Sequence, residues 1–148
     1  MAKFVFRFAS YLNLKSKLEE QKKLAYGNAL KQVEIEKQKK FALLAERASN
    51  IEEFRKKVRE HIAPAELQRH NNYLTYLKEA VAKQEIVIQK AEEQAELRRL
   101  ELVEAMKDRK TLEKLKENVY EEYLIEEKQA EMKVTDEIVS YKYNNLRR

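Results

Sequence analysis

The chain has 148 residues, of which 39% are Asp, Glu, Lys or Arg, and it contains one Gly, one Pro and no Cys. A compact domain of several elements needs turns, which draw on Gly, Pro, Asn and Asp, so this composition favours long helices or a coiled coil. The lack of Cys excludes disulfides and thiolate chemistry. A single Gly leaves no room for a phosphate loop, a dinucleotide fingerprint or a nucleophile elbow, so we expect neither an enzyme nor a cofactor.

The formal net charge of +5 is divided unevenly along the chain. Residues 1–62 hold 15 Lys or Arg against eight Asp or Glu, which gives +7, and residues 63–148 hold 16 against 18, which gives −2. The basic clusters are scattered and lack interleaved aromatic residues, so no nucleic-acid partner is expected. The apolar run at residues 4–8 is short and interrupted by Arg7, which argues against a signal peptide or a membrane span.

A first helix is predicted over about residues 4–62. Its apolar line is firm in the second half, where it runs through Leu30, Val33, Lys37, Phe41, Leu44, Ala48, Ile51, Phe54, Val58 and Ile62. Gly27 lies in the thinner first half and weakens the helix by about 1 kcal/mol relative to Ala. We therefore expect a softer helix around Gly27, without a break.

A bend is predicted at about residues 63–65. Pro64 lacks a backbone N–H and pushes Ala63 away from helical angles, so the first helix has to end before it. The same Pro is well tolerated in the first turn of a second helix, where Glu66 suits the positive helix terminus.

A second helix is predicted over about residues 65–146, a stretch without Gly or any further Pro. Alternating steps of three and four from residue 67 to residue 123 meet Leu67, His70, Leu74, Leu77, Val81, Gln84, Ile88, Ala91, Ala95, Arg98, Leu102, Ala105, Arg109, Leu112, Lys116, Val119 and Tyr123. Twelve of these 17 positions are apolar, where the composition alone gives about seven, so the line is a coiled-coil seam.

These elements predict an all-α fold, with two long helices in one antiparallel coiled-coil hairpin that forms a single domain over residues 1–148. Across the bend, paired residue numbers should add up to roughly 127, because one short connection folds the helices back on each other. Phe54 should then lie opposite Tyr73, Phe8 opposite Val119, and Phe4 opposite Tyr123.

The second helix should extend past the end of the first. The first helix is used up near Phe4, whereas the second continues for more than 20 residues after Tyr123. This overhang keeps an apolar line of Ala130, Val134, Ile138 and Tyr141 that no part of the chain covers. Such exposed apolar surface usually marks a partner site.

His61 and His70 flank the bend, with Glu60 and Glu66 nearby. These four side chains could be imagined as a metal site, but two partly exposed His residues beside a bend are the simpler interpretation, and we expect no metal. Acidic pairs elsewhere lie on long helices without the enclosing pocket that shifts carboxylate pKa values for catalysis.

Three stretches of the chain carry a family resemblance. They are FVFRF with YLNLK at residues 4–8 and 11–15, KTLEKL at residues 110–115, and EMKVTDE at residues 131–137. In this order, around a single central bend and over nearly the whole chain, they resemble the flagellar export protein FliJ family.

The resemblance implies a cytoplasmic hairpin of the flagellar type III export apparatus, similar to the central stalk of rotary ATP synthases and held peripherally at the inner membrane through the apparatus. Its terminal end is expected to bind the hexameric export ATPase, its bend end the export gate protein FlhA, and the hairpin also to handle export chaperones. We assign to the ATPase-binding end Phe4, Phe6, Phe8, Glu131, Lys133, Val134, Asp136, Glu137, Ile138 and Tyr141. The gate-binding end is expected to comprise Leu44, Ala48, Ile51, Tyr73, Leu77, Ala80 and Gln84.

Three alternatives are open at this point. A stalk subunit of another rotary or secretion ATPase would share the hairpin and the overhang. A coiled-coil spacer would share the fold without a specific partner. A binder of nucleic acid or membrane surfaces would use the basic first helix, and its affinity would fall steeply with salt.

Overall fold

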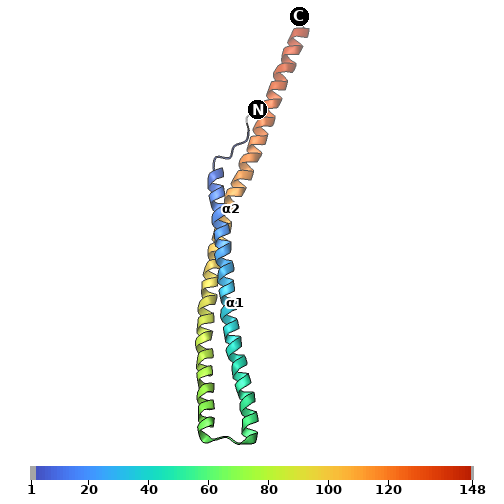
Figure 1. The fold of residues 1–148 in the computed structure, drawn as a ribbon. Helices are drawn as coiled ribbons and strands as arrows, with labels where there is room; N and C mark the ends of the chain where they lie inside the picture. The colour runs from blue at the N-terminus through green and yellow to red at the C-terminus, as the bar shows by residue number, and fades with distance from the viewer. Residues whose placement is uncertain (1–2, 148) are drawn as a thin grey trace. The chain divides into compact units, whose positions relative to one another are not determined.

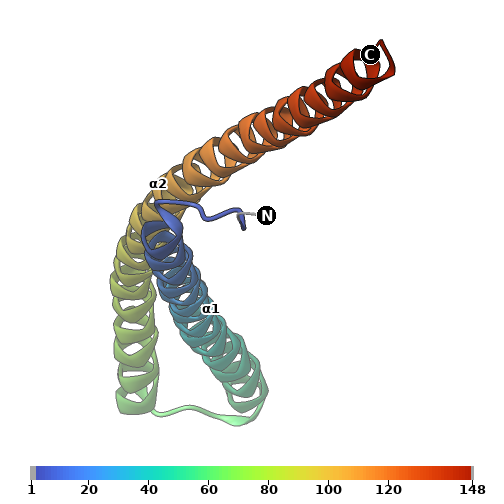
Figure 2. The same cartoon turned by 90° about the horizontal axis from the view of Figure 1, so that it is seen from above.

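The computed structural model describes residues 3–147 and contains two α-helices, α1 (Ala9–Glu60) and α2 (Pro64–Leu146) (Figure 1). They have 52 and 83 residues and are joined by the loop 61–63, which can be followed in Figure 2. No strand occurs in the described part of the chain. The two helices pack against each other, which confirms the predicted all-α hairpin.

By its internal contacts the chain divides into two compact units, and both helices pass through each of them. One unit comprises Met1–Glu20 with Glu104–Arg148, and the other comprises Gln21–Val103. In the second unit the helices run antiparallel, since Phe54 lies against His70 near the loop and Lys22 pairs with Glu101 at the other end.

The loop forms where the sequence places its single Pro. Pro64 is the first residue of α2, and the carbonyl of Ala63 accepts hydrogen bonds from the N–H groups of Glu66 at 3.0 Å and Leu67 at 3.2 Å. These bonds satisfy two of the free donors that every helix start presents. Glu66 in the first turn of α2, with Lys57 and Arg59 in the last turn of α1, matches the helix dipoles.

Helix α1 begins at Ala9, five residues later than predicted. Residues 3–8 are not helical, and the amide of Ala9 donates to the carbonyl of Phe6 at 3.2 Å. The ring of Phe4 lies against Tyr120 and Tyr123, while Phe6 is buried. A helix would point these two Phe side chains about 200° apart, and the non-helical segment is free of this constraint.

The seam of α2 follows the prediction closely. Fifteen of its 17 predicted positions are buried or half-buried, and the exceptions are Leu67 and Lys116. Leu77, Ile88 and Ala95 form its core in the second unit, and Leu77 is completely buried. Alternating steps of three and four are enough to find this seam because α2 is continuous over its whole length.

The seam of α1 differs from the prediction. The predicted line ran through Phe41, Leu44 and Ala48, and all three are exposed, Phe41 by 74%. Between Val33 and the loop the buried and half-buried positions are Glu36, Lys40, Leu43, Asn50, Ile51 and Phe54, of which Ile51 and Phe54 belong to the predicted line. From Glu36 to Asn50 the seam is thus displaced by one position and contains polar side chains, which a search for apolar residues cannot find.

Buried Glu36 explains the displacement. The side-chain amide of Gln84 donates to the Glu36 carboxylate at 2.5 Å and to the Glu36 backbone carbonyl at 2.9 Å. Gln32 and Lys39 on α1 also donate to this carboxylate, at 3.0 and 3.2 Å. A charge is tolerated in a seam when hydrogen bonds replace its hydration, and here they come from both helices.

Near the loop, the residue of α2 that lies opposite Phe54 is three positions closer to the loop than predicted. The ring of Phe54 stacks on His70, with centroids 3.8 Å apart and planes 4° from parallel, where Tyr73 was expected. The physical reason is the loop itself, which is centred on Ile62 because α1 ends at Glu60. At the other end of the seam, the contact of Phe4 with Tyr123 is confirmed, with ring centroids 5.4 Å apart.

Replacing Leu77 by Ala should lower the free energy of unfolding by about 2–5 kcal/mol, because it leaves a cavity in a fully buried part of the seam. Leu97, on the same helix and 52% exposed, is the matched control, and its replacement by Ala should have a much smaller effect. Urea unfolding followed by circular dichroism measures both. Equal losses for the two variants would contradict the assignment of the seam.

Candidate functional site: the two ends of the helix pair

The terminal segment, which we define as residues 124–147, is the most exposed part of the chain. Every residue from 128 to 147 is exposed. Among residues 3–147, no hydrogen bond, ion pair or aromatic ring contact joins this segment to residues 3–62. Within its unit, the overhang predicted from the sequence is therefore present as helix that makes none of these contacts with residues 3–62.

The first apolar line of the terminal segment, formed by Ala130, Val134, Ile138 and Tyr141, lies along one side of α2. Val134, Ile138 and Tyr141 are each more than half exposed. Glu127 and Thr135 flank the line and, with Glu131, border a shallow hollow beside Ala130 and Val134. The polar residues predicted for this end, Glu131, Lys133, Asp136 and Glu137, are all exposed as well. The segment can therefore offer apolar and charged contacts to one partner.

An aromatic cluster marks where the terminal segment begins. Phe4 packs edge-on against Tyr120, with centroids 5.0 Å apart, and also contacts Tyr123. Burial, followed by the nearby Glu127 carboxylate, raises the pKa of Tyr123. Of the three Phe residues predicted for this end, Phe6 is buried against Phe8, so only Phe4 and Phe8 present surface.

Close to this cluster, buried Glu19 of α1 pairs with Arg109 of α2. Arg109 also donates a hydrogen bond to Glu113 at 2.7 Å, and the hydrogen bonds that it donates to Glu19 and Glu113 raise its pKa. Lys15 and Asp108 form a further pair at 3.5 Å. These contacts fasten the N-terminal turns of α1 to α2 just before α2 continues alone.

The residues predicted for the gate-binding end do not form one surface. Glu46, one position before the seam of α1, accepts a hydrogen bond from Tyr73, one position before the seam of α2. Lys37 and Glu92, each one position after its seam, pair at 3.6 Å. Positions before the seam therefore share one flank of the helix pair, and positions after it share the other.

This rule separates the predicted set into two groups. Tyr73 and Ala80 lie on the flank of Glu46, whereas Leu44, Ala48 and Ile51 lie on the flank of Lys37. The two remaining members belong to the seam, since Leu77 is completely buried and Gln84 holds Glu36. A partner can approach either flank, but in the closed hairpin it does not touch Leu77.

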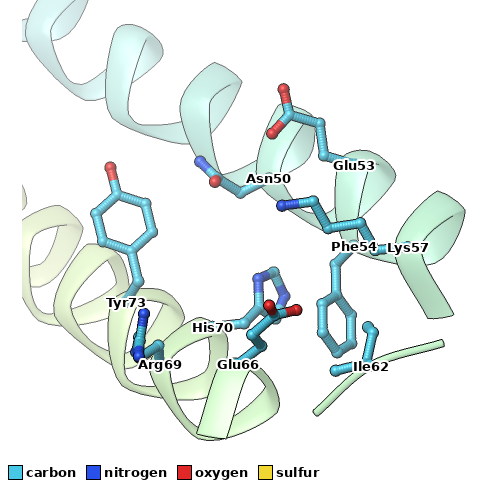
Figure 3. A pocket seen from close by; sticks show the side chains of 9 residues that line it. All are labelled: Asn50, Glu53, Phe54, Lys57, Ile62, Glu66, Arg69, His70 and Tyr73. Carbon is cyan, nitrogen blue, oxygen red and sulfur yellow. The ribbon is translucent and has the colours of Figure 1, made fainter.

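An open hollow of about 360 Å³ lies at the loop end (Figure 3). Asn50, Glu53, Phe54 and Lys57 of α1, Ile62 of the loop, and Glu66, Arg69, His70 and Tyr73 of α2 line it. Figure 3 shows the Phe54 and His70 rings side by side, with Ile62 next to Phe54. The sequence suggested no such hollow, because the stacked pair joins residues that were assigned different partners.

No metal centre is found at the bend in the described residues. His70 stacks on Phe54 and His61 is exposed, and no group of three or more His, Asp or Glu side chains between residues 3 and 147 is placed to hold a metal ion. Neither described helix is long and apolar enough to cross a membrane.

Comparison with known proteins identifies one family. The family model described as flagellar FliJ protein matches residues 4–148, which is essentially the whole chain. No curated relative and no solved structure matches it.

The Glu36 carboxyl provides a pH test of the seam. Hydrogen bonds from Gln84 and Lys39 lower its pKa, so the folded state is stabilised at pH values above the unfolded pKa, and this stabilisation is lost as the pH falls through the lower folded pKa. The pKa of the Glu96 carboxyl is also lowered, by hydrogen bonds from Arg99, and that of the Glu101 carboxyl is lowered by hydrogen bonds from Arg98. The midpoint of thermal unfolding should therefore decrease as the pH is lowered below about 4.5.

Replacing Gln84 by Ala should raise the pKa of Glu36 towards its ordinary value, because the largest cause of the shift is removed. Carboxyl carbon NMR titration measures this pKa directly. Gln89, exposed on the same helix, is the control, and its replacement by Ala should leave Glu36 unchanged. An unchanged titration of Glu36 in the Gln84 variant would refute the polar contact across the seam.

Proposed function

The chain belongs to the flagellar FliJ protein family, whose members are components of flagellar export, and we propose that it acts as a non-enzymatic, central-stalk-like subunit of the type III export apparatus. In this role the terminal segment binds the hexameric export ATPase, and the loop end binds the export gate protein FlhA. The hairpin works in the cytoplasm, meets the inner membrane only through the apparatus, and also escorts export chaperones.

The observation that carries the proposal is the terminal segment. It is exposed helix with an apolar line, and within the described residues it makes no hydrogen bond, ion pair or ring contact with residues 3–62. A single helix is about 10–12 Å wide, which is narrow enough for the central hole of a ring. There it would bias the conformations of the ring subunits, while the ATPase itself carries out hydrolysis.

The hairpin supplies the support that such a stalk needs. Glu19 with Arg109 and the rings of Phe4, Tyr120 and Tyr123 hold the start of the terminal segment to the N-terminal turns. A force on the terminal segment would therefore be transmitted to both helices, because these contacts join them. At the loop end, the exposed flanks around Tyr73 and Leu44 are the surfaces offered to the gate.

Truncation after Tyr123 should separate stability from function. It removes helix that makes no hydrogen bond, ion pair or ring contact with residues 3–62 among those described, so the thermal midpoint of the remaining chain should be almost unchanged. Stimulation of the hexameric export ATPase should be abolished, as measured by phosphate release. Full stimulation by the truncated chain would overturn the stalk proposal.

The proposal that the loop end binds FlhA is tested by comparing variants at the loop end with a variant in the terminal segment. Tyr73→Ala and Leu44→Gln, one on each flank, should retain their helicity, and at least one should weaken binding of FlhA about tenfold by calorimetry. Tyr141→Ala in the terminal segment is the matched control and should bind FlhA normally while stimulating the ATPase less. Normal FlhA binding by both loop-end variants would exclude a gate site on these flanks.

A further inference from the structure

The terminal segment carries a second apolar line besides the one that contains Val134 and Ile138. Ile125, Met132, Val139 and Leu146 recur at intervals of seven residues, and each is more than half exposed. Tyr143, also more than half exposed, lies four residues after Val139 and widens the line at its end. We call these five residues the second apolar line.

The two lines lie on nearly opposite sides of the helix. Met132 precedes Val134 by two residues, which corresponds to about 160° around an α-helix. Val139 follows Ile138 by one residue, which places it about 100° away, on the far side of that line from Tyr141. The faces between the lines are polar and include Gln129, Lys133 and Ser140.

A partner that docks on one side does not explain this pattern. A helix bound in a groove needs one apolar stripe and keeps its other face polar and hydrated. A second copy of the same helix would likewise cover a single seam. Two apolar lines on opposite sides instead fit a helix that is contacted from both sides at once.

The charge of the segment indicates the chemistry of that partner. Residues 124–137, the first part of the terminal segment, contain five Asp or Glu and two Lys, a net charge of −3, whereas the whole chain carries +5. The final residues reverse the sign, with Lys142, Arg147 and Arg148. An acidic band around a narrow helix is complementary to a lining of Lys or Arg, which would also guide the approach of the helix.

We infer that the terminal segment is enclosed from two sides by a partner whose lining combines apolar side chains with Lys or Arg around residues 124–137. The inference rests on the proposed function and deepens it, because it assigns both apolar lines and the acidic band to the surface inside the ring. The Glu131, Lys133, Asp136 and Glu137 side chains then lie between two apolar contacts.

The experiment compares paired variants of the full chain in binding to the hexameric export ATPase. Val134→Gln with Ile138→Gln alters the first apolar line, and Met132→Gln with Val139→Gln alters the second. Gln favours helix and all four positions are exposed, so far-ultraviolet circular dichroism should be unchanged. Gln129→Ala with Ser140→Ala on the polar face is the control, and Met132→Leu with Val139→Ile tests whether apolar character alone is sufficient.

Each Gln pair should weaken binding at least tenfold, while the control and the apolar pair should stay within about twofold of the unchanged chain. Binding of the unchanged chain should also weaken as salt is raised from 50 to 300 mM, because salt screens the acidic band. If only one Gln pair weakens binding, the two-sided enclosure is wrong and the proposed function stands. If both Gln pairs bind normally, the two-sided enclosure and the proposed function are both wrong. Binding that does not depend on salt would exclude the basic lining.

Discussion

The position of Pro64 sets the lengths of the two helices, and most other features depend on it. With a loop centred on Ile62, α1 can pair only with residues up to about 115, and α2 has no Gly or further Pro to stop it there. The non-helical residues before α1 add the contact of Phe4 with Tyr123. Residues 124–146 are helix that makes no hydrogen bond, ion pair or ring contact with residues 3–62, which is the property on which the proposed function rests.

Polar contacts determine how the two helices fit together. A seam of small and medium apolar residues such as Ala95 and Ala105 can slide by a turn at little cost, whereas Glu36 finds its hydrogen bonds with Gln84 in one register only. Glu19 with Arg109 acts in the same way in the other unit. We regard both contacts as devices for register, since sliding one helix along the other would leave a buried charge without its partner.

The two ends of the helix pair differ in chemistry, which fits two different partners. At the loop end, the stacked rings of Phe54 and His70 line an open hollow together with Lys57, Glu53 and Arg69, so aromatic side chains and charges of both signs meet there. The terminal segment is acidic over residues 124–137 and carries two apolar lines, with a shallow hollow beside Ala130 and Val134. A hollow between two helices and a single exposed helix require partners of different shape.

The sequence by itself determined the helices, the place of the bend, the seam of α2 and the overhang, because each follows from local chemistry: one Pro, one Gly and a regular apolar repeat. Only the tertiary structure decided which face of α1 turns inward, since Glu36 takes a seam position and leaves Phe41 exposed. It also decided that residues 3–8 are not helical, where Phe4 packs against Tyr120 and Tyr123 of α2. The inward face of α1 and the conformation of the residues before it depend on contacts between residues distant in sequence, so a local sequence pattern cannot predict them.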